Sequence, residues 1–269
     1  FSSAITNTYN VAVGYSAGGA VTTGVQNTLI GGLAGDAITT GGENVAVGYG
    51  ALTANTTASN NTALGRSSLE ANTTGGSNVA VGRDALGANT TASNNTAVGY
   101  NSLNANTTGA SNVAVGYQAL DANTTAAGNN AVGSQALSTN TTGASNIAIG
   151  QQAMFYNTTG SNNTAIGHVA LGDNTTASNN TAVGYFALNA NTTGTENVAL
   201  GQNAGYSNVS GSYGTFVGRG AGYNATGDFN TFIGMSSGDQ VTSGTKNTII
   251  GRYNGNQNGL DIRTTSNDV

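Results

Sequence analysis

Few side chains of this 269-residue chain could carry out acid–base or metal chemistry. It has one histidine, His168, no cysteine, and eleven acidic residues. General acid–base catalysis and metal binding need such groups to converge. The acidic residues are instead scattered and form no regular column of the kind that calcium-binding repeat proteins use. We therefore expect no enzymatic activity, no cofactor and no metal site.

A second set of side chains could recognise a surface. Tyrosine, arginine and histidine recur at one variable position of a sequence repeat, and exposed aromatic and arginine side chains are often used for binding. The candidate surface-binding residues are Tyr49, Arg66, Arg83, Tyr100, Tyr117, His168 and Tyr185. A solvated corner that tolerates any long side chain would look the same. Arg66 and Arg83 would stack about 5 Å apart on adjacent coils, and with Asp84 beside them we expect an ion-pair cluster.

These residues are positioned by a repeat of seventeen residues. Its first position is asparagine through most of the chain, and its phase slips by one residue after Gly214. The repeats begin at Asn10, Asn27, Asn44, Asn61, Asn78, Asn95, Asn112, Asn129, Asn146, Asn163, Asn180, Asn197, Gly214, Asn230 and Asn247. Positions 1 to 17 are numbered from this residue. We divide the chain into an N-terminal lead-in (1–9), a regular repeat solenoid (10–213), modified terminal coils (214–253) and a C-terminal linker or tail (254–269).

Each repeat is predicted to be one coil of a β-solenoid. Asn, Thr and Gly are poor helix formers. The segments N-V-A-V-G and A-L-x-A-N-T-T are two short β-favouring runs separated by turn residues. Parallel stacking of about fifteen coils gives an all-β fold, a β-roll in which residues at equal positions lie above one another.

Four positions are expected to shape the coil. Position 5 is glycine in every repeat, which indicates a tight bend. Position 4 is always aliphatic and position 9 is mostly leucine, and both columns are predicted to be buried. Position 3 is alanine through the middle of the chain. In some repeats position 3 holds a large apolar residue and position 9 holds glycine, which indicates that the two positions pack into the same interior layer. These pairs are Leu29 with Gly35, Phe216 with Gly222, and Phe232 with Gly238; the pairs Ala12 with Gly18 and Ala199 with Gly205 do not follow the rule.

If positions 3 and 9 share the interior, positions 2 and 4 face outward, because successive side chains of a strand point to opposite faces. The outward row is then mostly Val, Ile, Leu and Thr. A strand that is apolar on both faces is normally covered on both faces. We therefore predict a parallel homo-oligomer of three identical chains around an axis, in which partner chains cover this row.

Position 12 is predicted to form a ladder of stacked asparagine amides. Alternation from Leu52 would point Ala54 and Thr56 inward and Asn55 outward. The ladder comprises Asn55, Asn72, Asn89, Asn106, Asn123, Asn140, Asn157, Asn174, Asn191 and Asn208. Val21 and Ile38 take this position in the first two repeats, which suggests a different neighbour at that end.

Composition argues against two further classes of function. The formal net charge is -5 with 6% charged residues, and there is no basic stripe for nucleic acid. No run of about 18 apolar residues occurs, so we expect no membrane insertion. The chain begins without Met or a signal-like leader, and we interpret it as a piece of a longer polypeptide.

The sequence resembles known fibre proteins. Its core N-[VT]-A-[VIL]-G-x-x-[AS], as at Asn78–Ala85 and Asn146–Ala153, resembles the head repeats of trimeric autotransporter adhesins, which are trimeric left-handed parallel β-rolls. The longer unit N-T-A-V-G-Y-x-[AS]-L-x-A-N-T-T-G and the ending from Asn247 to Thr264 look more like bacteriophage tail fibre proteins, especially those that end in a self-cleaving chaperone domain. The resemblance covers essentially the whole chain, implies a left-handed coil, and carries over no binding residue. The seventeen-residue unit is longer than the adhesin repeat.

We therefore expect a structural and adhesive fibre segment, extracellular or on a virion surface, that presents repeated surfaces for attachment to a cell surface or glycan. Many weak contacts would add through avidity. Two alternatives stay open. The chain could polymerise end to end into an extracellular filament, through residues 1–10 or the tail after Tyr253. It could also be a monomeric solenoid that binds ice or glycan.

Overall fold

The computed structural model describes residues 8–257, 260–261 and 263–266. Residues 1–7 of the predicted lead-in, and residues 258–259, 262 and 267–269 of the predicted tail, lie outside the described residues. The chain divides into two compact units, Phe1–Asn129 and Asn130–Val269, called the first and second unit below. Among the described residues there is no helix long and apolar enough to cross a membrane.

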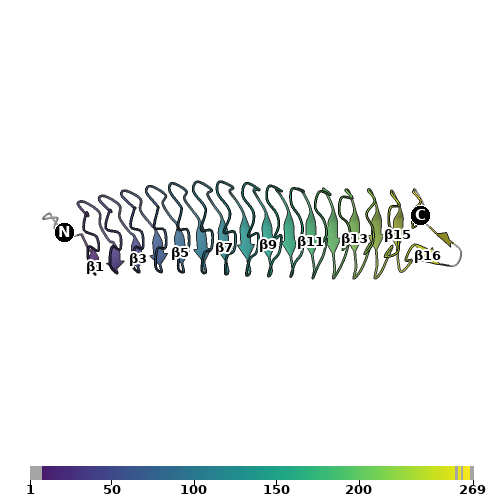
Figure 1. Ribbon diagram of the computed structural model, residues 1–269, viewed down its shortest axis with the longest axis horizontal. Coiled ribbons are helices and arrows are strands. Elements are labelled where there is room, and N and C mark those ends of the chain that lie inside the picture. The colour runs from purple at the N-terminus through teal and green to yellow at the C-terminus, as the bar shows by residue number, and fades with distance from the viewer. Residues whose placement is uncertain (1–7, 258–259, 262, 267–269) are drawn as a thin grey trace. The chain divides into compact units, whose positions relative to one another are not determined.

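Each coil contributes one three-residue strand. The first unit contains β1 (Val11–Val13), β2 (Thr28–Ile30), β3 (Val45–Val47), β4 (Thr62–Leu64), β5 (Val79–Val81), β6 (Thr96–Val98) and β7 (Val113–Val115). The second unit contains β8 (Asn130–Val132), β9 (Ile147–Ile149), β10 (Thr164–Ile166), β11 (Thr181–Val183), β12 (Val198–Leu200), β13 (Thr215–Val217), β14 (Thr231–Ile233), β15 (Thr248–Ile250), β16 (Asn256–Gln257) and β17 (Leu260–Asp261). Within each unit the three-residue strands lie side by side in chain order (Figure 1).

Neighbouring coils pair in parallel at the repeat distance. Ala46 in β3 lies opposite Ala63 in β4. Between β13 and β14 the partners are Phe216 and Phe232, so the one-residue slip is absorbed in a turn and leaves the strand register intact. β16 and β17 form a separate antiparallel pair. The predicted fold class, an all-β parallel β-solenoid with coils of about seventeen residues, is confirmed; handedness and trimer formation stay predictions.

The prediction of a second strand in each coil is wrong. The A-L-x-A-N-T-T run forms turns, and its leucine has a left-handed backbone, with φ 57° at Leu52. A left-handed residue breaks the strict alternation of an extended chain. The segment still bonds to the next coil, because the Leu52 amide donates to the Ser68 carbonyl at 3.0 Å. Backbone pairing is therefore preserved without extended geometry.

Positions 3 and 9 share the interior, as predicted. Side chains such as Ala46 and Leu52 are fully buried. The exchange of volume is confirmed as well, because a Cβ atom on Gly238 would lie 2.7 Å from the Phe232 ring. At the same distance, a Cβ atom on Gly18 would meet Leu29 of the next coil. Gly18 did not follow the rule within its own repeat. The space beside it is filled by the Leu29 side chain of the neighbouring coil.

Gly205 repeats this arrangement in the second unit, where an added Cβ atom would lie 2.7 Å from Phe216 of the next coil. Val21 and Ile38 belong to the same packing, because both are buried. The Ile38 side chain would lie 2.7 Å from a Cβ atom on Gly35. Filling of the coil interior therefore accounts for these two residues, and no different neighbour is needed.

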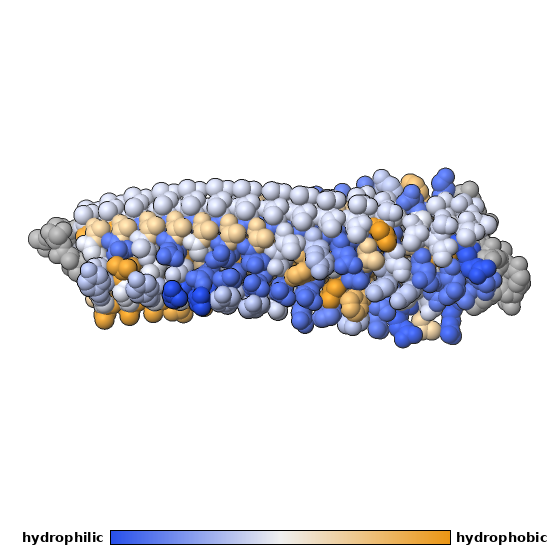
Figure 2. All heavy atoms as spheres, in the orientation of Figure 1, coloured by the Kyte–Doolittle hydropathy of each residue, from blue (hydrophilic) through white to orange (hydrophobic). Residues whose placement is uncertain are grey.

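Positions 2 and 4 point outward in both units, while the middle residue of each strand points inward. The single chain does not bury position 4, since Leu64 is 44% exposed and Ile149 is 41% exposed, so the predicted burial of this column depends on partner chains. Figure 2 shows hydrophobic atoms gathered along the edge that carries the strands of the first unit. This outward row of aliphatic and threonine side chains is the part of the fold that the predicted partner chains would cover.

The glycine at position 5 is required by the backbone. Gly65 has φ +142°, and a Cβ atom there would lie 2.5 Å from the carbonyl oxygen of Gly82 in the next coil. The same close approach recurs from coil to coil within each unit. The predicted tight bend is therefore confirmed, and it is set by the spacing between coils.

We expect Gly65→Ala to lower the free energy of unfolding by about 2–3 kcal/mol, because the new methyl group strains the backbone and pushes adjacent coils apart. Gly50→Ala is the matched control: a Cβ atom at Gly50 meets nothing closer than the Thr53 hydroxyl at 3.4 Å. Urea unfolding followed by circular dichroism measures both. Equal losses for the two variants would contradict this explanation.

Candidate functional site

The position 12 asparagines form the predicted amide ladder, but they point inward. Asn72 Nδ2 donates to Asn55 Oδ1 at 3.1 Å and to the Gly75 carbonyl at 2.9 Å. The prediction that the ladder faces outward is wrong, because these side chains are fully buried. The reason is the left-handed turn at position 9, which reverses the inward–outward order. The buried ladder residues are Asn55, Asn72, Asn89, Asn106, Asn123, Asn140, Asn157, Asn174, Asn191 and Asn208.

The ladder changes at its last step in the second unit. Asn191 Nδ2 donates to Asn174 Oδ1 at 3.1 Å, but the buried Asn191 Oδ1 has no hydrogen-bond partner. Asn208, in the next coil, instead accepts from the backbone amide of Gly211 at 2.8 Å. The regular amide stack therefore stops where the repeat begins to vary.

A second ladder, at position 1, was not predicted. The backbone amide of Asn78 donates to Asn61 Oδ1 at 3.0 Å, and Asn78 Nδ2 donates to the Ala92 carbonyl at 2.9 Å. Asn89 of the position 12 ladder donates to the same carbonyl at 3.0 Å. One carbonyl oxygen, with two lone pairs, thus joins the two ladders and fixes the turn between them.

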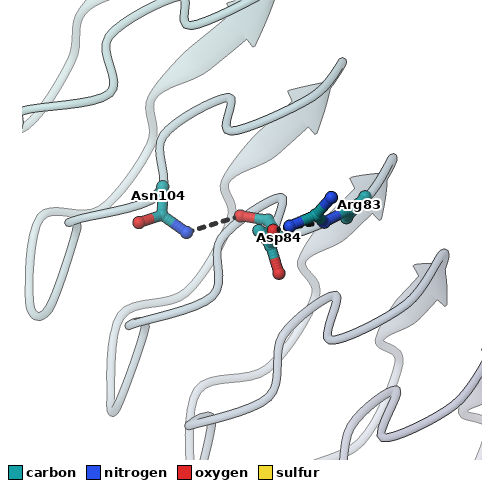
Figure 3. A network of polar contacts seen from close by, with 3 residues as sticks. All are labelled: Arg83, Asp84 and Asn104. Carbon is teal, nitrogen blue, oxygen red and sulfur yellow. Dashed lines mark hydrogen bonds and ion pairs between the residues drawn. The ribbon is translucent and has the colours of Figure 1, made fainter.

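In the first unit, the position 6 side chains form a short charged and aromatic row. Arg83 Nε pairs with Asp84 Oδ2 at 2.9 Å, and Asn104 Nδ2 donates to the Asp84 carbonyl at 2.7 Å (Figure 3). The Arg83 guanidinium lies 5.3 Å from the centre of the Tyr100 ring, and Tyr100 stacks on Tyr117 at 5.7 Å. An exposed pair and a cation–π contact each contribute about 0.5–1 kcal/mol or less. The row is thus a presented surface more than a source of stability.

The expected ion-pair cluster is reduced to one pair. Arg66 is exposed and takes part in no ion pair found among the described residues. Tyr49 is also exposed, and an added Cβ atom on Gly32 of the preceding coil would meet its ring at 3.4 Å. These two residues share the corner of the coil with Arg83 and are not joined to its network.

In the second unit, aromatic rings from neighbouring coils are in contact. His168 stacks on Tyr185 at 5.4 Å with an interplanar angle of 14°, and Phe186 meets both rings edge-on. Phe186 also meets Tyr206 at 6.0 Å, and Tyr206 stacks on Tyr223 at 5.0 Å. We call these five residues the aromatic strip. They place flat rings side by side on one surface of the second unit.

Only His168 and Tyr185 of this strip were predicted. Phe186 was missed because it lies at position 7, next to Tyr185 in the sequence. Tyr206 and Tyr223 were missed because they lie at position 10, although they are one repeat apart. Comparing position 10 between repeats would have revealed the second pair.

The remaining ionisable groups do not converge. No group of three or more His, Cys, Asp and Glu side chains that could hold a metal occurs in the described part of the chain. Burial raises the pKa of the Asp173 carboxyl. This residue lies at position 11, away from the position 6 column in the repeat.

We expect Asn89→Asp to lower the free energy of unfolding at pH 7 by about 3 kcal/mol, because a buried carboxylate cannot donate to Asn72 or Ala92. Burial should raise the pKa of the new carboxyl above its unfolded value of about 4. The protonated form regains a donor, so stability should be highest below about pH 4 and fall as pH rises through the folded-state pKa.

Urea unfolding at pH 4 and pH 7 measures this effect. Asn60→Asp is the control, because Asn60 is exposed and should change stability by less than about 0.5 kcal/mol at either pH. A loss at Asn89→Asp that is independent of pH would mean that the ladder hydrogen bonds are not its cause.

Comparison with known protein families, with curated proteins and with solved structures finds no match to this chain.

Proposed function

We propose that the chain is a segment of an adhesive fibre in which three identical solenoids lie in parallel and present repeated side chains to a cell surface. The observation that carries this proposal is the outward row at positions 2 and 4, which is aliphatic at position 4 in every repeat and is Thr, Val, Ile or Asn at position 2. Neither position holds a charged residue in any repeat. A large exposed apolar surface of this kind favours an interface.

A second copy of the chain matches this row better than an unrelated partner does. Every coil places an aliphatic side chain at position 4, with the spacing between coils of about 4.8 Å that parallel strands impose. An identical chain in parallel has the same spacing, so each coil can pack against the corresponding coil of its neighbour. Three chains, as opposed to two, are proposed from the resemblance to trimeric fibre proteins.

The attachment role is supported by the residues away from this row. The aromatic strip and the row formed by Arg83, Tyr100 and Tyr117 place rings and charge along the surface of the coils. Repetition in three chains would multiply weak contacts through avidity. A fibre on a cell or virion surface is the setting that uses both rigidity and repetition.

End-to-end filament assembly is the second candidate. The last strand of the stack, β15, pairs with β14 among the described residues, and its Ile250 is 76% exposed, the largest value in the position 4 column. An exposed strand edge can pair with another chain. This candidate predicts growth along the stack, whereas the fibre proposal predicts a closed assembly.

Light scattering of the chain at several concentrations should give a mass three times 26.4 kDa. Val81→Lys should reduce that mass to a single chain with the circular dichroism spectrum retained, because a charge in a buried apolar interface is costly. Thr74→Lys, on an exposed turn, is the matched control and should leave the mass unchanged. A single-chain mass for the unaltered protein would contradict the proposal, and a mass that grows without limit would favour the filament.

A further inference from the structure

We propose that a hollow in the second unit binds a single sugar ring. It has a volume of about 220 Å³ and is lined by Gln202, Asn203, Arg219, Gly220, Tyr223, Ser236 and Asp239. Its biological meaning rests on the attachment role proposed above, but the binding itself needs only the folded chain. The volume is below the 300–1,000 Å³ of pockets for drug-sized ligands, so the hollow has room for about one ring.

The hollow exists because one coil lacks a side chain. Gly220 lies at position 7, where neighbouring coils carry Asn203 and Ser236. A Cβ atom on Gly220 would have no neighbour closer than the Ser236 hydroxyl at 3.7 Å. Its φ of +66° is ordinary for this position, since Gln118 has φ 50° and Phe186 has φ 54°. Glycine here therefore opens space that a larger residue could fill without changing the coil.

Two acceptor atoms in the wall of the hollow lack partners. Asn203 Oδ1 and Asp239 Oδ1 are buried and accept no hydrogen bond. Buried polar atoms are rarely left unpaired, because the lost hydrogen bonds to water are not replaced. The Asn224 side chain donates to the Asp239 backbone carbonyl at 2.8 Å, which holds this segment in place. Both residues line the hollow, but these two oxygens are closed to solvent. An occupant would therefore reach them after a small shift of the lining side chains, and its hydroxyl groups would then supply the missing hydrogen bonds.

The charges around the hollow favour a neutral occupant with many hydrogen-bonding groups. Arg219 and Asp239 both line the hollow. They do not pair with each other, because the one ion pair found among the described residues joins Arg83 and Asp84. The Asp239 carboxylate disfavours a phosphate, and the Arg219 guanidinium disfavours a metal cation. Hydroxyl groups suit both, because they donate to the carboxylate and accept from the guanidinium.

An aromatic wall completes the match to a sugar. Tyr223 lines the hollow and stacks on Tyr206 at 5.0 Å with an interplanar angle of 12°. Tyr206 in turn meets Phe186 of the aromatic strip. A sugar ring has an apolar face of C–H groups and an edge of hydroxyl groups. The apolar face could pack on the tyrosine rings while the hydroxyl groups contact Asn203 and Asp239. The aromatic strip then continues the site for further sugar units of a glycan.

The test is ligand-observed saturation-transfer NMR on the full chain with free glucose, galactose, mannose and N-acetylglucosamine. At least one sugar should bind, and Gly220→Gln should weaken it about tenfold or more by filling the hollow. Gly50→Gln is the matched control, because Gly50 also lies at position 7 with φ +67°, and it should leave binding unchanged.

A second variant tests the proposal even if Gly220→Gln does not fold. Asp239→Ala should also weaken binding about tenfold, whereas Glu70→Ala, at the same position of an earlier coil and exposed, should not. Binding of none of the four sugars, or equal binding by Gly220→Gln and the unaltered chain, would overturn the proposal. Saturation transfer to free L-serine but to none of the sugars would also overturn it, since that result would show that Arg219 and Asp239 bind a zwitterion.

The same samples separate this proposal from the fibre. A trimer by light scattering that binds no sugar overturns the hollow as a sugar site and leaves the fibre standing. A single chain that binds sugar, with loss in Gly220→Gln, overturns the trimeric fibre and supports the hollow.

Discussion

Hydrogen bonding between consecutive coils is the constraint on which the other features depend. The Gly65 amide donates to the Val47 carbonyl at 2.8 Å, and the Val79 amide donates to the Asn95 carbonyl at 2.8 Å. Each position therefore meets its own copy in the next coil, and a buried polar column can be filled only by residues that hydrogen-bond to their own kind. An asparagine amide both donates and accepts, so it stacks on itself. A carboxylate only accepts, which explains why the two buried ladders are asparagine although acidic residues occur at the corners.

The interior must also be filled coil over coil, and this second requirement links residues that are far apart in the repeat. Phe216 is fully buried, and it occupies space left by Gly222 in its own coil and by Gly205 in the preceding one. A large side chain in one column is thus matched by glycine in another. The position 3 and position 9 columns are accordingly best understood as one packed layer.

The fold class could be predicted because period and composition are enough to indicate a solenoid, and the inward place of positions 3 and 9 followed from the exchange of volume. The path of the turns could not. Leucine gives no sequence signal for a left-handed backbone, so the φ of 57° at Leu52 was missed, and with it the inward direction of Asn55. Because the path of the turns was not predicted, part of the aromatic strip was missed as well. Position 10 was not placed beside positions 6 and 7, so Tyr206 and Tyr223 were not connected to Phe186.

Corner positions are where this fold can change without loss of stability. Side chains at positions 6, 7 and 10 take little part in the interior packing, and they vary from glycine to tyrosine and arginine between repeats. Position 7 has the same left-handed backbone with asparagine at 203 (φ 56°) as with glycine at 220 (φ 66°). Removing a side chain there opens a hollow and adding an aromatic one extends a surface, while the ladders and the glycine bend stay intact. The positions that stabilise the coil thus differ from those that vary at its surface, so a regular repeat could carry the proposed binding sites.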